Sequence, residues 1–141
     1  MNFKYYILIF CLLILSSCSN NPETYINHLE GYWEIEEVQL PDGSKKKYNY
    51  NDTVDYIEVS DSLVGFRIKL KPAFDGTYET SNDTEKFSIK IENDSLNLYY
   101  ETPFDSWKET VLFANNEQLK VTNKNKAVFL YKKFTPIDVT K

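Results

Sequence analysis

The sequence has few cysteines and few histidines, and these shortages exclude several kinds of site. The two cysteines, Cys11 and Cys18, both lie near the N-terminus, so neither can form a disulfide within the domain that follows. His28 is the single histidine. A zinc or redox centre needs several cysteine or histidine ligands at regular spacing, and this sequence has no such spacing. We therefore expect no metal and no cofactor.

Positive charge, glycine and methionine are also scarce. Sixteen Lys and Arg stand against 21 Asp and Glu, a formal net charge of −5. Nucleic-acid-binding domains usually carry an excess of basic residues, so we expect no nucleic-acid partner. Four glycines and one methionine contrast with 11 Tyr and 9 Phe. Aromatic residues favour strands, and 141 residues correspond to about one domain.

Residues 1–17 have the features of a bacterial lipoprotein signal peptide. Lys4 provides a basic start, and residues 5–15 form an apolar run of 11 residues, too short to span a bilayer. The segment Leu15-Ser16-Ser17-Cys18 resembles the lipobox, whose cysteine is lipidated before cleavage. An ordinary signal peptide that happens to contain a cysteine is the alternative. On the lipoprotein interpretation, Cys18 is the lipidation site and residues 18–21 are a lipidated tether.

The residues after Cys18 bear on which membrane face the anchor occupies. Ser19 stands where lipoproteins retained at the inner membrane carry Asp. Surface-exported lipoproteins of Bacteroidota carry an acidic cluster there, whereas Glu23 is the one acidic residue of this stretch. We therefore expect a lipid anchor in the cell envelope, at the outer membrane and facing the periplasm.

Residues 22–135 are expected to form one all-β domain, followed by a tail at 136–141. A short helix should precede the first strand, and short polar turns separate the strands, which implies antiparallel neighbours. A meander of about 8–10 strands buries its edges best by closing into an up-and-down barrel. The expected strands are 31–40, 45–50, 55–59, 63–71, 76–80, 85–92, 95–102, 107–114, 117–122 and 127–134.

The first of these strands contains a change of phase. Trp33 and Ile35 fall on one face by alternation, whereas Val38 falls on the other. A β-bulge near Glu36 and Glu37 would bring all three side chains to the same face, because a bulge inserts one extra residue into a strand.

The stretch Gly31-Tyr32-Trp33 resembles the G-x-W motif of the lipocalins and the wider calycin superfamily. Together with the lipobox, it makes the chain similar to small lipocalin-like lipoproteins of Bacteroidota. The resemblance implies that Gly31 allows a close chain crossing and that Trp33 plugs the closed end of the barrel. Lipocalins place an Arg of the last strand over this Trp, and here Lys132 or Lys133 would take its place. A ligand entrance would then lie at the opposite end.

Eight apolar or aromatic side chains are predicted to point inward. They could line a ligand cavity or fill a packed core, and we expect partial filling. The resemblance implies a small apolar or amphipathic ligand. The alternative is a packed barrel that acts as an accessory or inhibitor subunit through contacts with an envelope protein. The inward residues are Phe66, Ile68, Leu70, Phe87, Ile89, Leu98, Tyr100 and Trp107.

Other polar features are less specific. Glu109 alternates with apolar residues on an inward face, but no acid–base pair can be named, so we expect no enzyme. Thr53, Ser62 and Ser95 each follow an Asp and precede a hydrophobic residue, which resembles the O-glycosylation pattern of Bacteroidota. Turn chemistry explains the same residues, because Asp, Ser and Thr favour turns.

Overall fold

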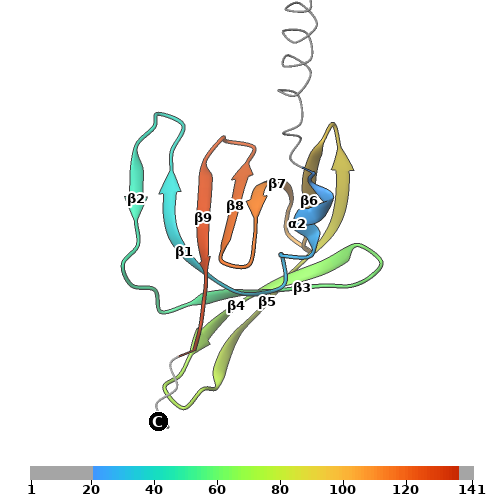
Figure 1. Ribbon diagram of the computed structural model, residues 1–141. Coiled ribbons are helices and arrows are strands. Elements are labelled where there is room, and N and C mark those ends of the chain that lie inside the picture. The colour runs from blue at the N-terminus through green and yellow to red at the C-terminus, as the bar shows by residue number, and fades with distance from the viewer. Residues whose placement is uncertain (1–20, 137–141) are drawn as a thin grey trace, which may run out of the picture.

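The computed structural model describes residues 21–136, which form a β-barrel preceded by one short helix (Figure 1). The predicted signal peptide, Cys18, most of the tether and residues 137–141 lie outside the described residues. Within residues 21–136, no helix is long and apolar enough to cross a membrane. The elements in chain order are α2 (Glu23–Ile26), β1 (Gly31–Gln39), β2 (Lys45–Lys47), β3 (Val54–Val59), β4 (Val64–Pro72), β5 (Tyr78–Glu92), β6 (Ser95–Glu101), β7 (Ser106–Ala114), β8 (Gln118–Asn123) and β9 (Val128–Lys133).

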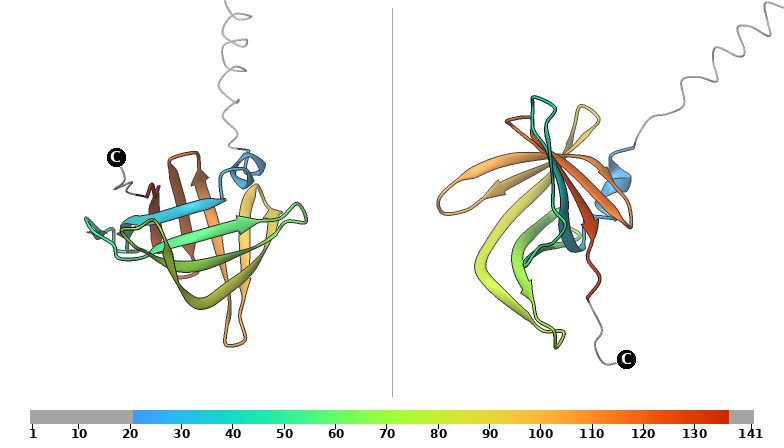
Figure 2. Two further views of the ribbon diagram at one scale, coloured as in Figure 1. Left: turned by 90° about the horizontal axis from the view of Figure 1, so that it is seen from below. Right: turned by 90° about the vertical axis from the view of Figure 1, so that its left-hand side faces the viewer.

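Eight of the described strands form a closed ring in which every neighbouring pair is antiparallel. The order around the ring is β1, β3, β4, β5, β6, β7, β8 and β9, and β9 pairs back to β1. Strand β2 pairs only with the far end of β1, from Glu37 to Gln39, so it stands beside the ring (Figures 1 and 2). Every strand of the ring thus has a hydrogen-bonded neighbour on both sides, although β5 pairs with β6 only from Lys86 to Glu92. The predicted antiparallel up-and-down barrel is confirmed.

The predicted bulge in β1 is also present. Ile35 pairs with Tyr131 and Glu37 with Leu130, so Glu36 is the extra residue on the β1 side. Beyond it, Val38 pairs with Phe129. The bulge therefore returns the apolar side chains of both halves of β1 to the interior, as the change of phase in the sequence predicted.

Strand β5 corrects one predicted turn. We expected Ser81-Asn82-Asp83 to separate two short strands, but β5 continues through these residues as one element of 15 residues. Asn82 has a φ of 61°, and the register between β4 and β5 shifts beside it. The polar triplet thus forms an irregularity within a strand, because Asn tolerates the left-handed conformation. Consequently Ser81 and Asp83 remain part of the barrel wall.

The closed end of the barrel is built around Trp33, which is 1% exposed. Its indole N–H donates to the Leu29 carbonyl at 2.8 Å. The Lys133 ammonium lies 4.3 Å from the centre of the Trp33 ring and donates to the Glu30 carbonyl at 2.7 Å. Partial burial lowers the pKa of Lys133, and nearby Glu30 opposes this effect. Lys133 therefore makes the predicted cation–π contact.

The second candidate lysine points away from this contact. Lys132 lies 3.9 Å from the Glu34 carboxylate, on the side of β9 opposite to Lys133. The alternation of side chains along a strand allows only one of two adjacent lysines to reach Trp33.

Gly31 makes the approach of Lys133 sterically possible. Gly31 has a φ of 124°, a conformation that residues with a side chain rarely adopt, and a Cβ there would overlap the Lys133 ammonium. The glycine of the motif is thus required by its backbone conformation, and a side chain there would also displace the Lys133 ammonium. This arrangement connects the first and last strands at the point where the ring closes.

Replacing Gly31 with Ala should destabilise the protein by about 1–3 kcal/mol, because it adds backbone strain and a clash with Lys133. Gly43→Ala is the matched control, since Gly43 also has a positive φ but nothing within 4 Å. Chemical denaturation measures both. If the two variants lost equal stability, the contact with Lys133 would contribute nothing.

Candidate functional site

The register of the strands identifies which side chains point into the barrel. Residues paired directly across two strands share a face, so the inward set can be traced from buried Trp33. Trp33 pairs with Asp55, and Asp55 pairs with Lys69. One step along, Ile57 pairs with Arg67. Strand β4 therefore directs its cationic side chains, Arg67 and Lys69, into the barrel.

This orientation corrects the predicted lining from β4. Phe66, Ile68 and Leu70 alternate with the cations and so lie on the outer face of the barrel, where they cannot line an internal cavity. Aromatic side chains cover part of that face: Phe66 lies 6.2 Å from the Tyr56 ring, and Tyr56 lies 4.8 Å from Tyr32. The outer face therefore offers an apolar environment, while the charged partners of Arg67 and Lys69 lie inside.

The other predicted inward residues do point inward, but they belong mainly to the packed half of the barrel. Phe87, Ile89, Leu98 and Tyr100 are buried members of the core, and none of them lines the charged cavity in the other half of the barrel. Trp107 packs against this core with its ring stacked on Tyr100, at a centroid distance of 5.0 Å and an interplanar angle of 5°. This half of the barrel is therefore filled by side chains.

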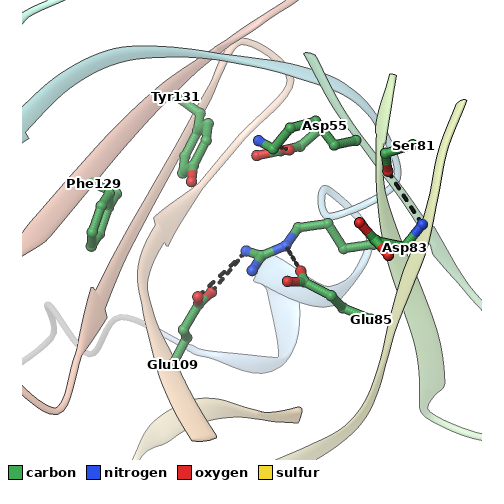
Figure 3. A pocket seen from close by; sticks show the side chains of 9 residues that line it. Asp55, Ser81, Asp83, Glu85, Glu109, Phe129 and Tyr131 are labelled. Atoms are coloured by element: carbon green, nitrogen blue, oxygen red, sulfur yellow. Dashed lines mark hydrogen bonds and ion pairs between the residues drawn. The ribbon is translucent and has the colours of Figure 1, made fainter. Parts of the chain in front are cut away.

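A cavity of about 410 Å³ occupies the other half of the barrel (Figure 3). On β5, Ser81, Asp83 and Glu85 line it, whereas Phe87, next on the same face, is already in the core. The cavity thus lies beyond the core on the side away from Gly31, where the sequence placed an entrance. Its lining consists of Asp55, Arg67, Lys69, Ser81, Asp83, Glu85, Glu109, Phe129 and Tyr131.

Arg67 lies between the cavity and the packed core. Its Nε donates to Glu85 at 2.7 Å, and its Nη1 donates to both oxygens of Glu109 at 3.3 and 3.4 Å. Its guanidinium carbon lies 4.6 Å from the centre of the Tyr100 ring. Three strands, β4, β5 and β7, therefore meet at one guanidinium, and Figure 3 shows the two carboxylates that bind it, those of Glu85 and Glu109.

The surroundings fix the protonation of the groups at this point. Burial opposes the charged form of Arg67, but Tyr100, Glu109 and Glu85 outweigh it, so the net effect raises the pKa of Arg67. Burial raises the pKa of Tyr100, an effect that Arg67 opposes. Burial also raises the pKa of Tyr131, and Asp55 adds to it. Arg67 is thus a permanent cation, and both phenols are neutral at physiological pH.

The cavity carries an excess of negative charge. Its lining includes four carboxylates, those of Asp55, Asp83, Glu85 and Glu109, but only two cations. Asp55 is paired with Lys69 at 2.9 Å, and Arg67 holds the two glutamates. Asp83 makes no ion pair with any residue in the part of the chain that the structure describes. The formal charge of the lining is therefore −2.

The remaining sequence predictions fall outside this cavity. Ser62 is exposed in the turn between β3 and β4, with its hydroxyl 2.9 Å from that of Ser60. Thr53 and Ser95 are half-buried beside β3 and at the start of β6. Their O-glycosylation stays a prediction. Among residues 21–136 no group of three or more His, Cys, Asp or Glu side chains could hold a metal ion.

Glu109 is the one member of the cavity that the sequence pattern singled out, because an acid alternated with apolar residues on a predicted inward strand. For the other residues that line the cavity, the sequence offers only indirect indications. A buried carboxylate needs a cation or hydrogen-bond donors nearby. An inward Glu109 therefore implies a lysine or arginine that also points inward. Arg67, on the strongly alternating strand β4, is a candidate for that cation.

The closed, up-and-down ring of strands with a tryptophan-plugged end and an internal cavity defines the chain as a lipocalin-like β-barrel. It is similar in fold to the crystal structure of a lipocalin-like protein from Bacteroides uniformis, with 13% sequence identity, a TM-score of 0.47, and coverage of 76% of this chain and 99% of that one. It is also similar to the structure of an uncharacterized protein from Bacteroides eggerthii, with 11% identity, a TM-score of 0.48, and coverage of 75% and 99%.

No family model matches the chain, and no curated protein matches it. The description of the fold rests on the strand order and register of the chain itself.

Replacing Arg67 with Met should destabilise the protein by about 3 kcal/mol at neutral pH, because it leaves the partly buried carboxylates of Glu85 and Glu109 without their cation. Chemical denaturation at neutral pH measures the loss.

Lys45→Met is the control for this experiment, because Lys45 pairs with Glu37 at 3.2 Å while about half of its side chain remains exposed. It should change stability by less than about 1 kcal/mol. An Arg67→Met protein as stable as this control at neutral pH would show that Arg67 is not held inside the barrel.

Proposed function

We propose that the protein binds a small amphipathic molecule that carries a positively charged group, in the cavity of the open half of the barrel. The observation that carries the proposal is the negative excess in an internal cavity: four carboxylates and two cations line it. The sequence predicted an apolar or amphipathic ligand. The charged lining favours the amphipathic type.

The size and position of the cavity support binding of a small molecule. Ligand sites in proteins usually occupy about 300–1,000 Å³, and the cavity measures about 410 Å³. The packed core closes it at one end, around Leu98 and Trp33. Barrels of eight strands are wide enough to hold one small ligand when their side chains leave room. The ring therefore provides a site for a small molecule that the packed core closes at one end.

The lining favours a cation over an anion. An anion would meet the carboxylates of Asp83, Glu85 and Glu109, while Arg67 is already engaged by two of them. A cation placed among these carboxylates gains charge-assisted hydrogen bonds in a partly desolvated space. Phe129 and Tyr131 add aromatic surface, which attracts cations and can also contact an apolar portion of the ligand.

The same proposal includes attachment to the cell envelope through Cys18. It is supported by the basic start, the short apolar run and the lipobox-like segment of residues 1–18. Lipid anchoring requires more than one acyl chain for stable attachment, which the processing of a lipoprotein provides. A domain held in this way would meet its ligand at a membrane surface. We expect no catalytic step, since no acid–base pair with a substrate position can be named.

A titration followed by ¹H–¹⁵N NMR tests ligand binding. Adding n-pentylamine should shift the amide resonances of Ser81, Asp83 and Glu109 in a saturable manner, because its ammonium group enters the cavity. Adding n-pentanol, which has the same chain and no charge, should shift them far less. Equal shifts with the two compounds, or none with the amine, would contradict the proposed function.

Replacing Cys18 with Ser should move the protein from the membrane fraction to the soluble envelope fraction, because the serine variant cannot be lipidated. Immunoblotting of fractionated cells measures the distribution. Cys11→Ser is the control, since Cys11 would leave with the signal peptide. A Cys18→Ser protein that still sedimented with membranes would overturn the lipoprotein assignment.

A further inference from the structure

Two carboxylates of the cavity keep unused capacity to accept hydrogen bonds, and they lie at different depths. Glu109 is beside the packed core, next to Arg67, and Asp83 lies further toward the open end. The two face the same open cavity from β7 and β5. Because the two carboxylates lie at different depths, they limit the kind of cation that fits the cavity.

Glu109 is only weakly satisfied by its partner. Both of its oxygens accept from a single nitrogen, Nη1 of Arg67, at 3.3 and 3.4 Å. Charge-assisted hydrogen bonds normally measure about 2.7–2.9 Å, the length of the Arg67–Glu85 contact at 2.7 Å. Glu85 therefore holds the guanidinium, and Glu109 has acceptor capacity to spare, although its side chain is only 14% exposed.

Asp83 is the carboxylate without an ion pair in the described part of the chain. It lies two residues before Glu85 on β5, so both face the cavity and are separated by roughly 7 Å along the strand. In the described residues, the one hydrogen bond of Asp83 outside the strand ladder joins its backbone N–H to the Ser81 hydroxyl at 3.3 Å. Its carboxylate is thus open to a ligand.

An independent observation, on the hydroxyl of Tyr100, also indicates unused hydrogen-bonding capacity at the deep end of the cavity. Tyr100 is 2% exposed, and its buried hydroxyl has no hydrogen-bond partner among the described residues. Tyr100 and Glu109 both line a small void of about 10 Å³ beside Arg67, which shares Asp55, Arg67 and Tyr131 with the cavity. Buried polar groups in proteins are almost always hydrogen-bonded. The deep end therefore has an unused hydroxyl beside an under-satisfied carboxylate.

From these positions we infer that the ligand carries two positive charges, as an aliphatic diamine does, with one ammonium at Glu109 and the other at Asp83. This inference rests on the proposed function and names its ligand class. Two ammonium groups would neutralise the formal charge of −2 in the lining, whereas a monoamine leaves one negative charge uncompensated. The methylene chain between them would lie along the aromatic surface of Phe129 and Tyr131.

Isothermal titration calorimetry of the protein with cadaverine and n-pentylamine tests the inference, since the two compounds share a five-carbon chain and differ by one ammonium group. Cadaverine should bind about threefold to fivefold more tightly, because a second charge pair forms at the exposed Asp83. Its advantage should decrease as the NaCl concentration rises, because salt screens exposed charge pairs more than buried ones.

Asp83→Asn provides the matched variant, because it removes the charge and nearly keeps the shape. It should weaken cadaverine binding more than n-pentylamine binding, so that the advantage of cadaverine is lost. Asp61→Asn, in the exposed turn at the closed half of the barrel, should change neither affinity. If both compounds bound the wild-type protein equally well, the diamine inference would be overturned while the proposed function would stand. If neither bound, the proposed function itself would be overturned.

Discussion

The ion pairs of Arg67 inside the barrel are the interaction on which the rest of the interior depends. The guanidinium joins Glu85 of β5 to Glu109 of β7 and lies over the ring of Tyr100. On one side of it, aliphatic and aromatic side chains fill the barrel; on the other, charged side chains surround open space. A buried charge is costly unless it is paired, so the packed half must end where these pairs form.

The closed end supplies the stability that the charged half cannot. Trp33 is enclosed by the Leu29 carbonyl, by the Lys133 ammonium and by the apolar core, and Gly31 leaves room for the lysine to cross. The first and last strands meet here, and this contact holds the ring closed. With closure secured at one end, the strands at the other end can surround a cavity, much as binding sites elsewhere are positioned by a rigid scaffold. The packed core and the charged cavity thus occupy opposite halves of one barrel.

Much of this fold follows from the sequence, and the reasons are local. The change of phase in β1 predicted the bulge at Glu36, and the G-x-W stretch predicted a buried Trp33 with a cation above it. The orientation of β4 did not follow, because alternation defines two faces without saying which is inward. The partners that decide it, Glu85 and Glu109, lie 18 and 42 residues from Arg67. The polar Ser81-Asn82-Asp83 segment likewise continues as a strand because β4 pairs with the residues before it and after it, from Tyr78 to Thr80 and from Thr84 to Ser88.

A crystal structure of the protein grown with n-pentylamine tests the central claim most directly, since it shows both the interior and its occupant. The account predicts the amine nitrogen within hydrogen-bond distance of Glu109, with Arg67 inside the barrel and in contact with Glu85. An Arg67 side chain that pointed to solvent, with Phe66 and Ile68 inside the barrel, would contradict it. So would an amine bound only on the outer surface.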